Sequence, residues 1–284
     1  MSPEDFEFAA QFFKDRSGLI LTRDKTYLLE NRLMPLVRDM RLKSVTELID
    51  GVRRGDSVLQ ALAVEAMMAK DTGFFRDWKP FTHLRTVVLP NLRVARGMKA
   101  GFRILSAGVS TGQEAYSVAM TIKDVSSSFP GWKVEVVGID ISAAAIAAAT
   151  KGVYNQFEVQ RGLPVHTLLQ YFTKQDDNWA LSDQIKSMVK FQAWNLLDDL
   201  YPLGRFDVVL CRNVLVYLDL KTKLDVLQKL ARLLVDDGAL YLGLNETVMG
   251  VSSSFRAINP DLGIYAAHRA DRPASLSLAA RVDL

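Results

Sequence analysis

The stretch from Phe102 to Met120, FRILSAGVSTGQEAYSVAM, constrains the fold more than any other part of the chain. Its first four residues form a short apolar run that suits a buried strand, and its last part has small and apolar residues at helical spacing. Gly108 and Gly112 lie between them in a turn of small residues, where a ligand can approach the backbone closely. The stretch therefore predicts a strand, a ligand-binding turn and the start of a helix in an α/β domain.

Two acidic residues narrow the class of ligand. Glu114 falls in the first turn of the expected helix and already supplies an anion there, which disfavours a phosphate and favours a ligand with positive charge or hydroxyl donors. Asp140 ends the β-branched run 133–139, and an acidic residue at the end of a second strand accepts hydrogen bonds from ribose hydroxyls. The spacing Gly108-x-x-x-Gly112 departs from the G-x-G-x-x-G of dinucleotide-binding proteins. S-adenosylmethionine (AdoMet) is therefore the better candidate, although the glycines could form only a tight turn and Asp140 could only cap a helix.

Composition excludes several classes of protein. A chain of 284 residues with 49% hydrophobic and 24% charged residues is typical of a globular protein with one or two domains. The apolar runs are too short for a membrane span, and the acidic N-terminus MSPEDFEF lacks a signal-peptide pattern, so we expect a cytoplasmic protein without membrane insertion. A single cysteine, Cys211, is compatible with a reducing compartment and is interpreted as a small buried residue. Three scattered histidines predict no metal site, and a net charge of +3 gives no reason to expect nucleic acid.

The chain divides into a helical part and an α/β part. Helical periodicity without a strand pattern predicts a helical domain over residues 1–90, followed by a polar linker at 91–100. From residue 101 to 270 strands and helices alternate, which predicts a parallel sheet covered by helices on both faces. We expect an inserted pair of strands at about 165–190 and a loose tail at 271–284.

The carboxyl edge of this sheet is the expected ligand site, because the parallel strands end there together. The residues at these expected strand ends are Gly108, Asp140, Asn195 and Arg212. The segment KDTGFFR, residues 70–76, adds a further candidate near the junction of the two parts. Its aromatic pair suits a core, whereas Arg76 is either a ligand contact or part of an interdomain ion pair.

Basic residues outnumber acidic ones on the second and third expected helices of the helical part. Arg38, Arg41, Arg53 and Arg54 could form a face that docks an acidic partner. An ordinary solvated helix surface explains the same residues equally well.

Taken in order, several motifs resemble the CheR family of chemotaxis receptor methyltransferases over residues from about 5 to 268. They read YLLENRLMPLVRDMRL (27–42), DTGFFRD (71–77), SAGVSTGQEAYSVAM (106–120), GIDIS (138–142), NLLDDL (195–200), FDVVLCRNVLVYLD (206–219) and DDGALYLGLNE (236–246). The resemblance implies an N-terminal all-α domain for substrate recognition, then a Rossmann-like AdoMet-dependent methyltransferase domain with a small antiparallel β-subdomain. It also implies an enzyme that methylates glutamate side chains on the cytoplasmic helices of chemoreceptors and releases S-adenosylhomocysteine.

Site residues follow from the same resemblance. It implies cofactor contacts at Lys70, Thr72, Arg76, Gly108, Glu114, Asp140, Asn195, Leu196, Arg212 and Asn213. Arg76 and Tyr217 match the residues placed at the methyl-transfer site, although Tyr217 could instead be a core tyrosine.

The chain departs from the family pattern at a few places. Lys70 stands where an asparagine is common, Gln113 and Ala115 replace a Glu and a Pro, and Leu244-Asn245-Glu246 keeps only the Glu of His-Ser-Glu. The loop 173–180 is short and lacks the glycine-rich insertion of members that bind a receptor's C-terminal pentapeptide, so we expect a pentapeptide-independent enzyme. We also expect a monomer. A methyltransferase with another protein target, and an AdoMet-binding signalling protein without catalysis, are the alternatives.

Overall fold

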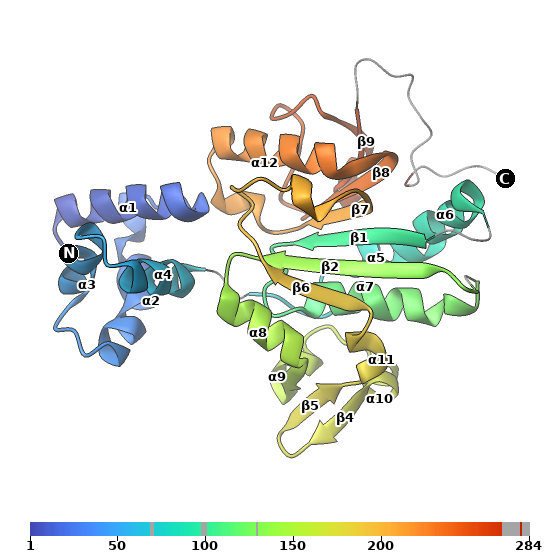
Figure 1. Ribbon diagram of the computed structural model, residues 1–284, viewed down its shortest axis with the longest axis horizontal. Helices are drawn as coiled ribbons and strands as arrows, with labels where there is room; N and C mark the ends of the chain where they lie inside the picture. Colours follow the sequence, from blue (N-terminus) through green and yellow to red (C-terminus); the bar gives the residue numbers. More distant parts are fainter. Residues whose placement is uncertain (69–70, 98–100, 129, 269–278, 280–284) are drawn as a thin grey trace. The chain divides into compact units, whose positions relative to one another are not determined.

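The computed structural model describes residues 1–68, 71–97, 101–128, 130–268 and 279. The chain forms two compact units (Figure 1). One contains Met1–Ala69 together with Tyr217–Thr222, and the other contains Lys70–Val216 and Lys223–Leu284.

The described part of the N-terminal unit is helical, as expected, and contains four α-helices. Their bounds are α1 Pro3–Ser17, α2 Thr26–Asp39, α3 Val45–Arg53 and α4 Ser57–Met67, with a short 3-10 turn at Arg23–Lys25. The Ser2 side chain accepts a hydrogen bond from the Asp5 N–H at the start of α1, and Gly18 ends that helix in the left-handed conformation. Pro35 lies inside α2 without dividing it. The apolar faces of the helices meet in one core that includes Phe13, Leu29 and Leu48.

The first unit ends near Ala69, not near residue 90 as the sequence suggested. The following helical segment consists of α5 Lys79–His83, a π-helical turn Leu84–Val88 and α6 Leu89–Arg96. Its buried residues, among them Phe81, Leu84 and Leu92, pack into the core of the second unit. The expected linker at 91–100 is likewise helical through Arg96, while 98–100 lie outside the described residues.

The second unit contains the expected sheet. Its seven strands follow the order β6 Val189–Ala193, β2 Lys133–Asp140, β1 Gly101–Ala107, β7 Phe206–Cys211, β8 Leu234–Leu242, β10 Ile264–Ala267 and β9 Phe255–Asn259. The first five run parallel, and the last two pair antiparallel. The prediction of an α/β domain with a mainly parallel sheet is confirmed.

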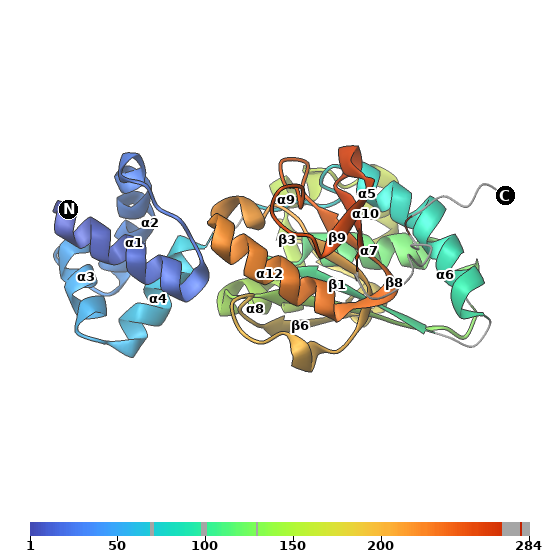
Figure 2. The same cartoon turned by 90° about the horizontal axis from the view of Figure 1, so that it is seen from above.

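Helices cover both faces of this sheet (Figure 2). α7 Gln113–Asp124 and α8 Ala143–Lys151 follow β1 and β2 on the path toward β6, whereas α12 Leu220–Leu233 connects β7 to β8 in the opposite direction. Because such crossovers are right-handed, the reversal of direction puts α12 on the other face from α7.

A separate three-stranded antiparallel sheet is inserted between β2 and β6. Its order is β3 Val153–Asn155, β5 Asn178–Leu181 and β4 Phe172–Gln175, and it carries α9 Gln156–Gln160, α10 Val165–Tyr171 and α11 Asp183–Lys186. Its strands therefore span 153–181 and not 165–190, because β3 pairs with β5 across the intervening helices and residue 189 already begins β6.

The C-terminal tail and membrane insertion are the two remaining expectations about the fold. The tail expected at 271–284 lies outside the described residues except for Ala279, which is buried. Within the described ranges, every helix is too short or too polar to span a bilayer.

Candidate cofactor and methyl-transfer site

The carboxyl ends of β1, β2, β6 and β7 meet at one edge of the sheet, because these strands are parallel neighbours. This edge brings together the strand ends at Gly108, Asp140, Asn195 and Arg212, as expected. β1 and β7 are adjacent, and the chain proceeds from them in opposite directions across the sheet. Such a switch point is where open α/β sheets bind ligands.

The glycine turn after β1 is held on two sides. Gly108 and Gly112 both have positive φ, at 72° and 97°, which favours glycine. The N–H groups of Gly108 and Val109 donate to the carbonyl of Ile139 at 2.8 and 2.9 Å, and the hydroxyl of Tyr154 donates to the Thr111 carbonyl at 2.8 Å. The turn is therefore fixed by β2 and by the inserted sheet.

Asp140 lies beside this turn at the end of β2. Its carboxylate accepts the N–H of Ser110 at 2.8 Å and the N–H of Ser142 at 2.9 Å. The cap of α8 itself is Ser142, whose hydroxyl accepts the Ala145 N–H. A carboxylate at this position accepts hydrogen bonds and is of the type that binds ribose hydroxyls.

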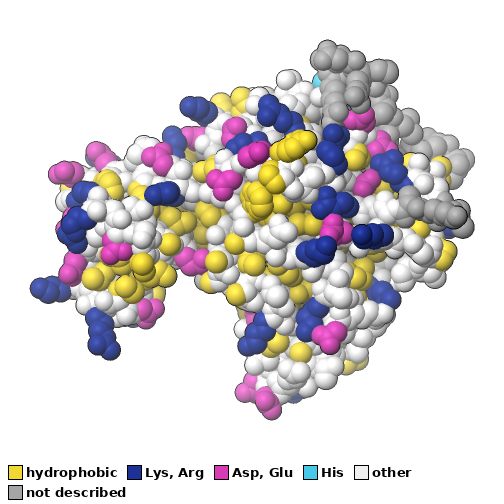
Figure 3. Space-filling model, in the orientation of Figure 1, with side chains coloured by type: hydrophobic (Ala, Val, Ile, Leu, Met, Phe, Trp, Pro, Cys, Tyr) yellow, Lys and Arg dark blue, Asp and Glu magenta, His cyan; other side chains and the backbone are white. Residues whose placement is uncertain are grey.

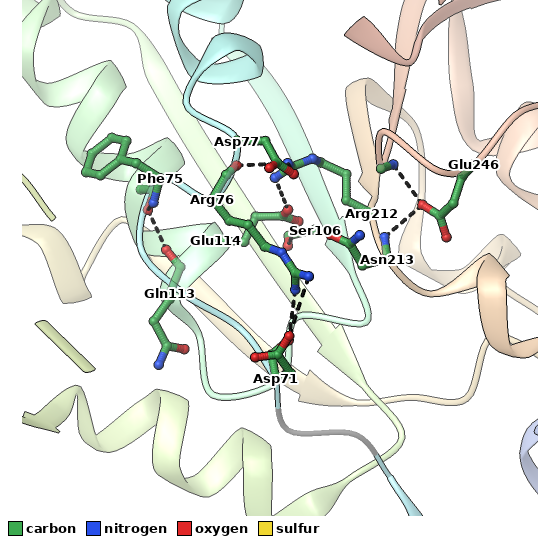
Figure 4. Close-up of polar contacts among 12 residues, drawn as sticks. Asp71, Phe75, Arg76, Asp77, Ser106, Gln113, Glu114, Arg212, Asn213 and Glu246 are labelled. Atoms are coloured by element: carbon green, nitrogen blue, oxygen red, sulfur yellow. Dashed lines mark hydrogen bonds and ion pairs between the residues drawn. The ribbon is translucent and has the colours of Figure 1, made fainter. Parts of the chain in front are cut away.

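Arg212, directly after β7, is the centre of a buried charged cluster (Figure 4). Its side chain is 2% exposed and donates from Nη1 to Glu114 Oε2 at 3.0 Å. Nη2 donates to Asp77 Oδ2 at 3.0 Å and to the carbonyl of Arg76 at 2.8 Å. The hydroxyl of Ser106, the second-last residue of β1, donates to the other oxygen of Glu114 at 2.8 Å. The cluster thus ties together β1, α7, β7 and the segment 71–77.

The charges of the cluster do not cancel. One guanidinium faces two carboxylates, Glu114 and Asp77, and the carboxylate of Asp140 ends the neighbouring strand. These carboxylates suit a ligand that carries positive charge and ribose hydroxyls. AdoMet carries a sulfonium, an ammonium and a ribose. The Ser110 hydroxyl in the glycine turn is buried and has no hydrogen-bond partner among the described residues. The chemistry of the edge therefore fits AdoMet.

Arg76 contributes its main chain to this cluster but turns its side chain away from it (Figure 4). Its guanidinium donates to the Asp71 carbonyl at 3.1 Å and lies 3.4 Å from the Asp71 carboxylate. Arg161, from the inserted segment, lies 2.6 Å from the other oxygen of Asp71, and this bond holds the pKa of Asp71 below its usual range. The ion pair of Arg76 thus lies within the second unit and is not the interdomain pair considered as an alternative.

The backbone around Arg76 is strongly constrained. Phe75 and Asp77 both have positive φ, 46° and 54°, and the Phe75 N–H donates to the hydroxyl of Ser117 at 2.9 Å. Ring packing of Phe75 against Phe81 adds to this bond. The segment therefore presents Arg76 from a fixed main chain, and Phe74 and Phe75 have the core role expected of them.

Three of the other candidate contacts are half-buried. Asn195 and Leu196 are half-buried after β6, where the Trp194 N–H donates to the Asp140 carbonyl at 2.8 Å. Thr72 is half-buried, and Lys70 lies outside the described residues.

Asn213 and Tyr217 follow Arg212 in the chain. The N–H of Asn213 donates a hydrogen bond to the Glu246 carboxylate at 2.7 Å. Tyr217 groups with the N-terminal unit, where its carbonyl accepts the Ile20 N–H; its side chain is 41% exposed, which contradicts the core alternative. Cys211 is fully buried, and burial raises the pKa of its thiol, in keeping with an inert residue.

Within the described part of the N-terminal unit, only some of the arginines expected to dock an acidic partner are free of an ion pair. Arg38, Arg41 and Arg54 are exposed, but Arg53 pairs with Asp5 and Asp50 at 2.8 Å each. In the view of Figure 3 basic and acidic side chains are interspersed over this unit.

Sequence reasoning missed Asp77 and Ser106, and it assigned no role to Glu246. Asp77 directly follows Arg76 and Ser106 lies two residues before Gly108, so each is close in the chain to a residue that was singled out. Nothing local indicated that their side chains meet Arg212 or Glu114.

Comparison with known proteins shows the family of this chain. The all-alpha domain model of CheR methyltransferases matches residues 4–67, and their SAM-binding domain model matches residues 70–264. Chemotaxis protein methyltransferase 1 of Pseudomonas aeruginosa is 36% identical over 92% of this chain and 96% of its own length, and chemotaxis protein methyltransferase of Vibrio parahaemolyticus is 34% identical over 93% and 96%. The probable biofilm formation methyltransferase WspC of P. aeruginosa is 31% identical over 95% of this chain and 65% of its own length. The chain belongs to the CheR methyltransferase family.

Proposed function

We propose that this enzyme transfers a methyl group from AdoMet to glutamate side chains on the cytoplasmic helices of methyl-accepting chemoreceptors. The observation that carries the proposal is the acid-rich cluster of Arg212, Glu114 and Asp77 beside the glycine turn, within a chain that matches both domains of the family. The names of the two chemotaxis relatives support the receptor as substrate. We further propose that the enzyme acts in the cytoplasm as a monomer.

The residues present suffice for this chemistry. A glutamate carboxylate is ionised at neutral pH, so it can attack the methyl group without a general base or a protein nucleophile. When bound, AdoMet supplies an electrophilic methyl group. Asp140 would hold its ribose, and Glu114 with Asp77 would favour its positive charge, while Asn195 and Leu196 would border its adenine. The remaining task is to hold and align the substrate carboxylate, which is a matter of position.

Arg76 is proposed to hold a carboxylate at the reacting end of the site. Replacing it by Ala should lower kcat by roughly 100-fold, because the reacting oxygen loses its alignment. Arg161→Ala is the matched control: it removes the other guanidinium from Asp71 and should leave kcat within about twofold, since exposed pairs contribute little. Near-normal turnover of Arg76→Ala would overturn the assignment. Tyr217 is proposed to orient the attack of the glutamate carboxylate on the methyl group. Tyr217→Phe should therefore lower kcat and change the KM for AdoMet little.

Receptor docking is proposed to involve Arg38, Arg41 and Arg54. The double variant Arg38→Glu/Arg41→Glu should raise the KM for receptor and leave the affinity for S-adenosylhomocysteine unchanged. Arg53, also among the expected docking residues, is a poor test because its loss would disturb the Asp5 pair that joins α3 to α1. An unchanged KM for receptor in the double variant would argue against this face.

We also propose that the enzyme does not need a receptor C-terminal pentapeptide. The β4 and β5 strands are joined by a two-residue turn, Asp176-Asp177, with Asp176 at a φ of 50°. This tight turn supports the proposal because it leaves no room for an insertion between the strands. Deleting the last residues of a receptor fragment should then leave its methylation rate unchanged.

The decisive experiment is transfer of labelled methyl from AdoMet to a chemoreceptor cytoplasmic fragment, followed by base treatment. Release of labelled methanol is expected, because glutamyl methyl esters are base-labile. Binding of AdoMet without transfer to the receptor would instead favour a different protein target. Absence of AdoMet binding would overturn the proposal altogether.

A further inference from the structure

Glu246 is a buried carboxylate that the proposed chemistry does not use. It lies four residues beyond the end of β8 and is 8% exposed. The carboxylate accepts three main-chain N–H groups: Asn213 at 2.7 Å, Gly243 at 2.7 Å and Val216 at 3.2 Å. Figure 4 shows this carboxylate beside Asn213, on the side of Arg212 away from Asp71.

The two oxygens of Glu246 bind the two ends of one short segment. Oε2 accepts the N–H of Asn213 and Oε1 accepts that of Val216. Segment 213–216 connects Arg212, at the centre of the charged cluster, to Tyr217, the candidate at the methyl-transfer site. A single side chain therefore fixes both ends of the segment that directly follows Arg212.

The main chain at Asn213 and at Gly243 packs closely around the Glu246 carboxylate. Asn213 has a φ of 59°, a left-handed conformation that costs free energy and persists only where the surroundings impose it. A Cβ on Gly243 would lie 2.8 Å from Glu246 Oε2, 2.9 Å from Asn213 Nδ2 and 3.0 Å from the Asn213 nitrogen. The turn after β8 therefore packs directly against the segment after β7, one residue beyond the last strand pair, Cys211 and Leu242.

We propose that Glu246 is a positioning residue for the cofactor edge: its carboxylate holds segment 213–216 so that Arg212 and Asn213 present a preformed surface to the cofactor. The inference rests on the cofactor site proposed above. The negative charge is essential to it, because three N–H donors converge on a group that must only accept. A glutamine of the same size would turn an NH₂ group toward at least one of these donors.

Asp207, on β7, provides a matched control for Glu246. It is also a buried carboxylate, 7% exposed, and it accepts the Arg103 N–H at 2.9 Å and bonds from Arg96, but it lies at the start of β7 and not at the end. Asp207→Asn should lower the thermal midpoint and leave cofactor binding unchanged, which separates general destabilisation from loss of positioning.

The test compares Glu246→Gln and Asp207→Asn in the full chain by titration calorimetry with S-adenosylhomocysteine, by steady-state kinetics and by thermal unfolding. Wild-type binding, measured first, tests the cofactor site itself. Glu246→Gln is expected to raise the Kd by about tenfold and to lower kcat, as the loss of a charged hydrogen bond implies. A Kd and a kcat within twofold of wild type would overturn the proposal.

Gly243→Ala perturbs the same contacts without changing a charge, and it serves if Glu246→Gln does not fold. Its added Cβ meets Glu246 and Asn213 in the folded chain, so the same rise in Kd is expected. Normal cofactor affinity in this variant would show that the position of the segment does not matter, and would equally overturn the proposal.

Discussion

The guanidinium of Arg212 lies in the protein interior, where its side chain is only 2% exposed. Removing a guanidinium from water is costly, and the two carboxylates that face it, Glu114 and Asp77, compensate for that cost only while all three are present. The ring of Phe81, 5.7 Å from the guanidinium carbon, adds a weaker attraction. Arg212 is therefore both a structural support of the segment 71–77 and part of the electrostatics of the site.

Arg212→Met should lower the free energy of unfolding by about 3 kcal/mol, because it leaves two partly buried carboxylates facing each other. Arg212→Lys should be intermediate, since an ammonium keeps the charge but cannot bond both carboxylates as a planar fork does. Urea unfolding measures both. Arg205→Met is the control: its side chain is 49% exposed, lies 3.6 Å from Asp236 and donates to the Leu234 carbonyl, so a smaller loss of about 1 kcal/mol is expected. An equal loss in Arg212→Met and Arg205→Met would contradict the account.

For single residues, the sequence predicts a place in the site where that place follows from the local pattern of a strand or helix. Asp140 and Arg212 end strands that are recognisable as apolar runs, and Glu114 lies in the first turn of a recognisable helix. Asp77 and Glu246 act through contacts to residues far away in the chain, at Arg212 and Asn213. No periodicity or motif spacing indicates such pairs, so they could be found only in the folded structure.

At the scale of elements, tertiary contacts override local preference at the start of β8. Asp236-Asp237-Gly238 has the composition of a turn, yet all three residues lie within β8, which begins at Leu234. Leu234 pairs with Phe206 across a register shift, and Asp237 receives two bonds from Arg96, at 2.6 and 2.8 Å. These partners make an extended conformation favourable for residues that look like a turn.

The junction of the glycine turn and α7 depends on the absence of a side chain at Gly112. A Cβ there would lie 2.9 Å from the Ala149 Cβ and 3.2 Å from its Cα, and the φ of 97° is unfavourable for any other residue. Gly112→Ala should therefore lower stability by more than about 2 kcal/mol and weaken cofactor binding. Thermal unfolding and calorimetry measure the two effects.

Gly131→Ala is the matched control for this element. Gly131 also has a positive φ, 76°, but nothing lies within 4 Å of its added Cβ. It should show only the backbone cost of about 1 kcal/mol and normal cofactor binding. If Gly112→Ala were no worse than Gly131→Ala, the contact between α7 and α8 would not limit the turn.

At the scale of the whole molecule, the chain returns to its N-terminal unit after β7. Segment Tyr217–Thr222 belongs to that unit by its contacts. Leu19 and Leu218 form an isolated β-bridge, and Lys14 lies 2.7 Å from the Asp219 carboxylate. The sequence indicated a helical part and an α/β part but not this return, because it depends on pairings between residues about 200 positions apart.

Asp219 connects this return to the start of α12, since its carboxylate also accepts the Thr222 N–H at 2.8 Å. The bond from Lys14, followed by those from Thr222, holds the pKa of Asp219 well below its usual value. A carboxyl group whose pKa is lower in the folded than in the unfolded chain stabilises the fold above the unfolded pKa, about 3.9. That stabilisation is lost as the pH falls below about 4 toward the folded pKa.

Asp219→Asn should accordingly lower the thermal midpoint at pH 7 and flatten its decline as the pH is reduced from 5 to 2. Lys14→Met is the matched control, because it removes the ion pair but leaves the Thr222 bond. Its midpoint at pH 7 should lie between those of wild type and Asp219→Asn. Thermal unfolding followed by circular dichroism across this pH series measures all three proteins. Parallel curves for wild type and Asp219→Asn would show that this carboxylate does not contribute to the acid sensitivity of the fold.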